Sequence, residues 1–312
     1  MTKQLKTVTR TQGNNAALKD GTVRPAGVSF EFEEVPVLVH AFRRMVRGLE
    51  FDVCEMAFTT YLAAKAHGKR FTALPVFLVR DFHHRAIKVN TTLGIRDPKD
   101  LAGRKVGVNR GYTVTTGVWA RGILQQQYGL DLDAVTWVLS GDEHVAEYRP
   151  PANVVPAPDG RDLADMLIGG ELAAVIGVDV DHPDVEYLIP DAGEAGYEAL
   201  RTSGHYPINH LVVVKDELLD ADPGLAEVVF DAFAEAKNRY VAGLSAIAEP
   251  SATDRRYQRV RAVTGADPLP YGIEPNRRAI EQLVDHAVSQ HILTERPEAE
   301  SLFAERTRHL SA

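Results

Sequence analysis

The sequence FTALPVFLVRDFHHRAIKVN, residues 71–90, decides the architecture that we expect. Residues 71–79 are almost entirely apolar and predict a buried strand. That strand is followed by a cluster of ionisable side chains: Arg80, Asp81, His83, His84 and Arg85. A second extended segment follows at 86–90. Two adjacent imidazoles flanked by guanidinium groups at a strand end predict a site for an anionic ligand that exchanges protons.

Predicted strands and helices alternate on both sides of this stretch. Before it, strands are predicted at Leu5–Arg10, Val28–Val35 and Phe51–Met56, and helices at Val39–Leu49, closed by Gly48, and at 59–67. After it, strands are predicted at Lys105–Asn109, Val135–Leu139, Ala173–Val178 and His210–Val214, and helices at 97–101, 113–128, 163–169, 222–247 and 275–291. This alternation indicates an α/β fold with mostly parallel sheets.

Two short extended crossings, at 86–90 and 208–214, predict two lobes joined by a double hinge. Lobe 1 then comprises residues 1–86 and 208–312, and the inserted lobe 2 comprises residues 87–207. Proteins built this way bind their ligands in the cleft between the lobes, and the hinge closes around the ligand.

The composition is that of an ordinary globular protein, with 312 residues, 45% hydrophobic and 25% charged. A net charge of −8 argues against nucleic acid as a partner. The apolar runs are far shorter than the roughly 20 residues that cross a bilayer, so no membrane partner is expected. The N-terminus lacks the apolar segment of a signal peptide, which predicts a cytoplasmic protein. The oligomeric state stays open, a homo-oligomer included.

Histidines and one glutamate are the candidate acid–base groups, because an imidazole with its usual pKa near 6.5 exchanges protons at neutral pH. His83 and His84 follow a strand, where at most one of two neighbours faces the cleft. His210 precedes the strand LVVV at the return crossing, and His205 is a weaker candidate on a loop. Glu55 is either a second acid–base group or the orienting partner of a histidine. Each of these side chains could instead be a structural or solvated residue.

Arginines at strand ends are the candidate carboxylate clamps. Arg10, Arg80 and Arg110 each follow an apolar strand, and such ends face the ligand crevice in open α/β sheets. Arginine pairs with a carboxylate through two oriented hydrogen bonds. Any one of the three could be an ordinary solvated arginine, but three equivalent positions predict at least one carboxylate contact.

The start of the helix after the strand Lys105–Asn109 offers a second kind of anion site. Tyr112, Thr113 and Thr115 lie there, where helix N-termini present unpaired N–H groups and hydroxyls. The simpler interpretation is that Thr113 or Thr115 only caps the helix. Thr59 makes a similar but weaker case in lobe 1.

Metal and cofactor sites are not expected. Asp179, Asp181 and His182 form a ligand set that is too sparse, and Pro183 places it on a loop. The single cysteine, Cys54, excludes an internal disulfide and a cysteine-rich metal site. No glycine-rich nucleotide-binding motif is evident, so we predict a protein without cofactors.

Several ordered segments resemble the 4,5-dihydroxyphthalate decarboxylase family: FDVCEMAFTTYLAA (51–64), LPVFLVRDFHHRAIKVN (74–90), GIRDPKDLAGRKVGVNRGYTVTTGVWARGIL (94–124), DLADMLIGGELAAVIG (162–177), GHYPINHLVVVKDEL (204–218) and PYGIEPNRRAIE (270–281). The resemblance implies a fold similar to type II periplasmic binding proteins. The chain departs from the family pattern at 109–112 and at Tyr206, which lie near the expected pocket and add Tyr206 to the candidate substrate contacts.

The resemblance also implies an activity, the decarboxylation of a hydroxylated aromatic dicarboxylate such as 4,5-dihydroxyphthalate without a cofactor. Such a carboxy-lyase would protonate the ring carbon and then release CO2. Two alternatives stay open, because one fold serves many functions. One is a solute-binding protein for a small organic anion, and the other is a dehydratase or synthase like those of the menaquinone pathway.

Overall fold

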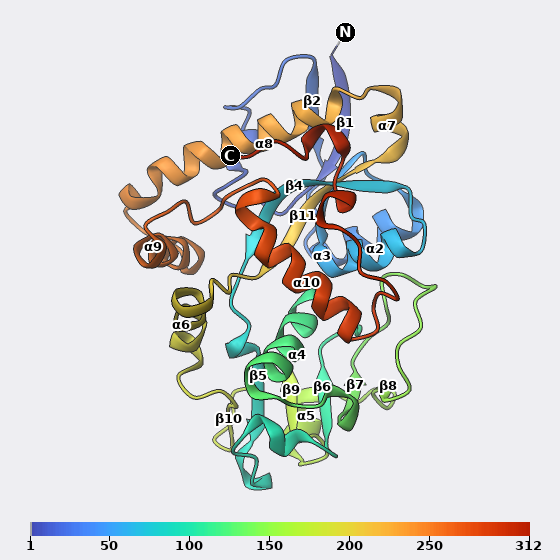
Figure 1. Cartoon of the computed structure of the whole chain (residues 1–312), viewed down its shortest axis with the longest axis vertical. Coiled ribbons are helices and arrows are strands. Elements are labelled where there is room, and N and C mark those ends of the chain that lie inside the picture. The colour runs from blue at the N-terminus through green and yellow to red at the C-terminus, as the bar shows by residue number, and fades with distance from the viewer. Residues whose placement is uncertain (1) are drawn as a thin grey trace. The chain divides into compact units, whose positions relative to one another are not determined.

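The computed structural model describes residues 2–312 as two compact units (Figure 1). Unit 1 contains the residues up to Arg80 together with Ile208–Glu281 and Pro297–Ala312, and unit 2 contains Asp81–Pro207 and Gln282–Arg296. The sequence placed the first boundary at residue 86. The structure places it at Arg80 because residues 81–86 contact unit 2: His84 Nε2 lies 3.0 Å from Gln127 Oε1, and the Gly177 N–H donates to the Ala86 carbonyl at 2.8 Å. Residues 282–296, expected in lobe 1, group with unit 2.

Unit 1 is built on a five-stranded sheet in the order β2-β1-β3-β11-β4. The strands are β1 (Lys3–Val8), β2 (Val28–Phe32), β3 (Val53–Ala57), β4 (Phe71–Arg80) and β11 (Ile208–Lys215). The first three run parallel, whereas β11 is antiparallel to both β3 and β4. The sheet is therefore less parallel than the sequence indicated, because β11 brings the chain back from unit 2 in the opposite direction.

Helices cover the unit 1 sheet: α1 (Ala16–Lys19), α2 (Leu38–Gly48), α3 (Phe58–Ala66), α7 (Asp216–Ala221), α8 (Leu225–Gly243), α9 (Ala252–Thr264) and α10 (Arg277–Ser289), whose last eight residues belong to unit 2. In α2, Leu38, Phe42 and Met45 recur at helical spacing and are buried. The helix ends at Leu49, which takes the left-handed conformation expected for a cap, so Gly48 is its last helical residue rather than its cap.

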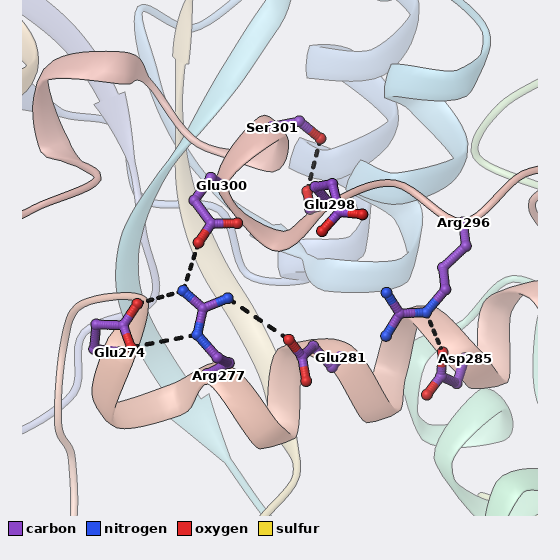
Figure 2. A network of polar contacts seen from close by, with 8 residues as sticks. All are labelled: Glu274, Arg277, Glu281, Asp285, Arg296, Glu298, Glu300 and Ser301. Atoms are coloured by element: carbon purple, nitrogen blue, oxygen red, sulfur yellow. Dashed lines mark hydrogen bonds and ion pairs between the residues drawn. The ribbon is translucent and has the colours of Figure 1, made fainter.

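An ion-pair network holds the last segment of the chain to α10 (Figure 2). The Arg277 guanidinium contacts the carboxylates of Glu274, Glu281 and Glu300, with Nη2 at 2.5 Å from Glu300 Oε1. Glu300 comes after residues 282–296, which belong to unit 2. Its ion pair with Arg277 therefore attaches the end of the chain to unit 1. A bridge between Ala73 and Phe303 then joins that segment to β4.

Unit 2 has a six-stranded sheet in the order β10-β5-β9-β6-β7-β8. The strands are β5 (Ile87–Asn90), β6 (Lys105–Val108), β7 (Thr136–Leu139), β8 (Val154–Pro156), β9 (Ala174–Ile176) and β10 (Val185–Tyr187), and the helices are α4 (Thr115–Tyr128), α5 (Leu163–Ile168) and α6 (Ala192–Ser203). The strands from β9 to β8 run parallel, and β5 is antiparallel to its neighbours. Leu163 and Leu167 of α5 pack on Val138 and Val175 of the sheet. None of the helices in residues 2–312 combines the length and the apolar character needed to cross a membrane.

Candidate active site

The residues singled out from the sequence divide between the two units. Unit 1 holds Arg10, Glu55, Thr59, Arg80 and His210, and unit 2 holds His83, His84, Arg110, Tyr112, Thr113, Thr115, His205 and Tyr206. Each group is described within its own unit below.

Sheet register brings Glu55 and His210 together in unit 1. Val212 of β11 lies directly opposite Glu55 of β3, and His210 lies opposite Ala57. Because side chains two residues apart share a face of the strand, His210 and Glu55 are diagonal neighbours on one face. The pairing of β11 with β4 shifts register on both sides of His210. Register shifts of this kind change the direction in which nearby side chains point, and here they occur at His210.

The two side chains form a hydrogen-bonded pair. His210 Nδ1 lies 2.7 Å from Glu55 Oε1, and the other carboxylate oxygen accepts a hydrogen bond from the Arg10 backbone N–H at 2.9 Å. The Glu55 side chain is fully buried, whereas that of His210 keeps 16% of its surface exposed. The Phe42 ring meets the imidazole edge-on, 5.2 Å between centroids.

This geometry assigns roles to the two imidazole nitrogens. A carboxylate partner makes Nδ1 the donor, so Nε2 is the nitrogen that can give or take a proton. The buried Glu55 carboxylate and the Phe42 ring hold the His210 imidazole in one orientation. A carboxylate-oriented imidazole with one exposed edge is suited to general acid–base chemistry.

Arg10 joins this pair to a cavity within unit 1. Its side chain is exposed and, within residues 2–312, forms no hydrogen bond or ion pair. It lines a cavity of about 560 Å³ together with Gln12, Tyr240 and Ser251. The Gln12 Nε2 group is buried and has no hydrogen-bond partner in the described chain. The cavity therefore presents the Arg10 guanidinium, and the backbone N–H of the same residue is bonded to Glu55.

The start of α3 lies beside the same pair. The helix begins at Phe58, directly after Ala57, the residue opposite His210. Its first turn carries Thr59 and Thr60, both buried. The N-terminal N–H groups of a helix attract negative charge, so the position of α3 favours an anion near His210.

Arg80 is part of a structural network in unit 1. Its Nη1 donates to Asn276 Oδ1 at 2.6 Å, and its backbone carbonyl accepts a hydrogen bond from Arg256 at 2.9 Å. Asn276 in turn donates to the carbonyls of Pro270 and Gly272. The Arg80 side chain is nearly fully buried, so it helps to pack β4 against the C-terminal region.

The candidate histidines of unit 2 lie in its interior. His83 and His84 form a turn and a 3-10 helix after β4, and both are buried. His84 Nε2 lies 3.0 Å from Gln127 Oε1, and its ring meets that of His205 edge-on at 5.8 Å. Trp119 contacts both His205 and His286 edge-on.

Burial keeps this cluster neutral. It lowers the pKa of His84, that of His205 to about 3 and that of His286 to about 4, since the charged forms would lose their hydration. His84 Nδ1, His205 Nε2 and both nitrogens of His286 have no hydrogen-bond partner in the described chain. These imidazoles are poor proton donors at neutral pH. A general acid is expected instead at a partly exposed position.

The predicted anion site at the start of α4 contains a carboxylate from the same chain. The backbone N–H groups of Tyr112 and Thr113 donate to Glu143, the latter at 3.2 Å, and Thr113 Oγ1 donates to Glu143 Oε2 at 2.6 Å. The cap residue of α4 is Val114, without a side-chain bond, so neither Thr113 nor Thr115 caps the helix. Arg110, before this turn, is exposed and has a φ of 69°, which is unusual for a residue other than glycine and is typical of functional turns.

Two further positions that the sequence analysis considered, Tyr206 as a substrate contact and Asp179 as an unexpected metal ligand, have ordinary surroundings. The Tyr206 ring is buried and packs 5.6 Å from that of Phe82. Asp179 pairs with Lys88 at 3.3 Å. Within residues 2–312, no group of three or more histidine, cysteine or acidic side chains is arranged to hold a metal ion.

Two named relatives align with most of the chain, although no family model matches it. The 4,5-dihydroxyphthalate decarboxylase of Comamonas testosteroni is 30% identical over 298 residues, which cover 86% of this chain and 87% of that protein. The 4,5-dihydroxyphthalate decarboxylase of Pseudomonas putida is 35% identical over 208 residues, covering 60% and 78%. The chain belongs to the 4,5-dihydroxyphthalate decarboxylase family.

Solved structures place this family member among the periplasmic-binding-protein-like folds. The aliphatic sulphonate binding protein SsuA from Escherichia coli matches with a TM-score of 0.56 at 12% identity, covering 99% of this chain and 100% of that one. The desulfurization enzyme DSZB matches with a TM-score of 0.50 at 16% identity, covering 97% and 96%. Binding proteins and an enzyme thus share the fold, so the site must carry the argument for function.

Sequence reasoning missed two residues that shape the candidate sites of this decarboxylase-family protein. Phe42 supports His210 from α2, and Glu143 reaches the start of α4 from a loop about 30 residues further along the chain. No sequence pattern marks either residue as part of a site. Phe42 is one of several apolar residues in its helix, and Glu143 is one of several acidic residues in its loop.

Proposed function

We propose that the protein is a cofactor-independent decarboxylase acting on a hydroxylated aromatic dicarboxylate such as 4,5-dihydroxyphthalate. The observation that carries this proposal is the Glu55–His210 pair in a chain of this family. The two named relatives supply the substrate class. A passive binding protein needs a clamp for its ligand but has no need of an oriented acid–base pair beside it.

Direct loss of CO2 from an aromatic ring would leave an aryl carbanion, and the free energy of this carbanion is too high for a useful rate. A ring hydroxyl para to the departing carboxylate avoids it. A base removes the hydroxyl proton, and the phenolate pushes electron density onto the carbon that bears the carboxylate. Protonated His210 then delivers the Nε2 proton to that carbon, which gives a dienone that still carries both carboxylates. The bond to the carboxylate breaks, CO2 leaves, and its electron pair restores the aromatic ring.

Each part of unit 1 has a task in this sequence. Glu55 keeps the Nδ1–H of His210 in place and balances the charge of the imidazolium. Arg10 is free to pair with the carboxylate that the substrate keeps, and the N-terminus of α3 favours the anionic ring oxygen or carboxylate. In unit 2, Arg110 and the α4 turn are proposed as further carboxylate contacts, and His83 and His84 as the other acid candidates.

The test is turnover of 4,5-dihydroxyphthalate, measured as released CO2, by the wild type and by single variants. His210→Gln should fold and bind substrate but lose about 10²–10⁴ in kcat, as for removal of a general acid. Glu55→Gln should also lower kcat. His84→Gln tests the alternative acid in unit 2, and it should keep most of its turnover because burial lowers the pKa of that imidazole. His309→Gln, which alters an exposed histidine outside both candidate sites, is the control and should leave turnover unchanged.

Product formed in deuterated water should carry deuterium on the vacated ring carbon. Full turnover by His210→Gln would refute His210 as the acid, and loss of turnover in His84→Gln alone would transfer that role to unit 2. Absence of CO2 with the wild type, together with substrate binding, would instead support a solute-binding protein.

A further inference from the structure

The turn between β6 and α4 of unit 2 holds an internal carboxylate. Glu143, from the loop after β7, accepts hydrogen bonds from the N–H groups of Tyr112 and Thr113 and from the Thr113 hydroxyl. Its carboxylate also covers Gly111 so closely that a Cβ there would stand 2.7 Å from Oε2. Three converging donors around one carboxylate form the same arrangement that proteins use for anionic ligands.

A buried positive charge supports the same turn from below. Arg121 of α4 has no exposed surface, and its guanidinium stacks 3.8 Å from the Tyr112 ring and donates to the Tyr112 carbonyl at 2.6 Å. Its Nη1 has no hydrogen-bond partner in residues 2–312 and lies beside Gly117, in the first turn of α4. Within residues 2–312 no carboxylate forms a direct ion pair with this guanidinium. Burial lowers the pKa of Arg121, but the negative charge of Glu143 favours the charged form and raises that pKa again. The positive charge of Arg121 therefore favours a carboxylate at this turn.

We propose that Glu143 is an internal competitor that occupies a carboxylate subsite of unit 2 and leaves when the carboxylate of an aromatic ligand binds there. This inference rests on the proposed function, because it takes the ligand to be an aromatic carboxylate. Glu143 is only partly buried, so its side chain can turn to solvent. One carboxylate then replaces another, and the N–H groups of Tyr112 and Thr113 never remain unpaired in the protein interior.

The exchange makes the subsite selective. A neutral group forms weaker hydrogen bonds than a carboxylate and cannot displace Glu143, whereas an ionised carboxylate can. The resting occupant therefore raises the Kd of every ligand that uses this subsite, and it keeps out uncharged groups, which bind the donors too weakly to displace it. Glu143 would therefore influence which ligands use this subsite by competing with them for the same donors.

The test is calorimetric binding of phthalate, which lacks the ring hydroxyls that turnover needs, to the full-length protein. Glu143→Gln should bind phthalate about tenfold more tightly than the wild type, because the amide holds the donors roughly half as strongly. Glu171→Gln, which alters an exposed carboxylate paired with Arg161 in the same unit, should bind like the wild type. Equal or weaker binding by Glu143→Gln with an unchanged melting temperature would overturn the proposal.

A second variant tests whether the ligand uses the place that Glu143 vacates. In the Glu143→Gln background, Gly111→Ala puts a methyl group where the carboxylate lay, so the gain in phthalate affinity should vanish. A double variant that binds as tightly as Glu143→Gln would overturn the shared subsite. If Glu143→Gln unfolds, Glu143→Asp, whose shorter side chain reaches the donors poorly, should give the same gain.

Neutral ligands and turnover separate the two hypotheses. Benzamide should bind Glu143→Gln without the gain seen for phthalate, and an equal gain for both would mean a loosened loop rather than competition. Absence of CO2 from 4,5-dihydroxyphthalate with the wild type would refute the decarboxylase, whereas a missing phthalate gain with normal turnover would refute only the competitor.

Discussion

Acidification should destabilise unit 2 through its buried histidines. His205 and His286 are 3% and 1% exposed, and burial lowers the pKa of His205 to about 3 and that of His286 to about 4. Their rings pack against Trp119, and a Cβ on Gly122 would stand 2.4 Å from the His286 ring. Almost no surface of either side chain is therefore available for water to hydrate a charged imidazole.

The sign of the pH effect follows from proton uptake. An unfolded histidine has a pKa near 6.5, so below that pH the unfolded chain binds protons that the folded chain refuses. The stabilising contribution is therefore complete above about pH 6.5 and is lost as the pH falls toward the folded pKa values, about 4 for His286 and about 3 for His205. Between pH 7 and pH 5, each histidine should remove about 2 kcal/mol from the free energy of unfolding, and the two together about 4 kcal/mol.

The assay is urea unfolding followed by tryptophan fluorescence at pH 7 and pH 5. The chain has two tryptophans, Trp119 and Trp137, and both are buried in unit 2, so their emission reports on that unit. His286→Phe keeps an aromatic ring and should recover about 2 kcal/mol of the loss at pH 5. His309→Gln, at an exposed position of unit 1, should change nothing. An equal pH dependence in the wild type and His286→Phe would refute the reasoning.

Two predictions concern the stability of unit 1, each measured by urea unfolding followed by circular dichroism. Asp267→Ala should cost about 3–5 kcal/mol because it strands the fully buried Lys237 ammonium, bonded at 2.7 Å, whereas Lys237→Met leaves a hydrated Asp267 and should cost less than about 1.5 kcal/mol; equal costs would contradict this asymmetry. Gly13→Ala should cost about 1–3 kcal/mol, since its Cβ would stand 2.1 Å from the Tyr240 ring, and an unchanged midpoint would show that the ring yields freely.

Apolar periodicity was a sound guide to the strands and the larger helices. The predicted strand 71–79 is β4 (Phe71–Arg80), and the predicted helix Val39–Leu49 is α2 (Leu38–Gly48). Helix α9 (Ala252–Thr264) escaped prediction because only Tyr257 and Val260 of its residues are buried, which leaves almost no apolar stripe.

Contacts between distant residues were beyond the reach of local patterns. Glu55 was recognised as a possible partner for a histidine, but 155 residues separate it from His210, and only the register of β3 and β11 selects that one. The threonines at the start of α4 were interpreted as an anion site or, more simply, as helix caps. Neither interpretation included Glu143, which Thr113 contacts, because it follows 30 residues later. His83 and His84 were judged by strand alternation, although the chain has already left the strand and both are buried.

Most of unit 2 is inserted in the chain between β4 and β11 of unit 1, and this order bears on how the chain is made. Strand β11 lies between β3 and β4 in the sheet but is synthesised only after residues 81–207, a stretch of 127 residues. At typical rates of translation this interval lasts about 6–25 s. During that time the edges of β3 and β4 carry unpaired N–H and C=O groups, which are templates for pairing with other chains. The nascent chain should therefore be most prone to aggregation on the ribosome, before the strand that carries His210 completes the sheet.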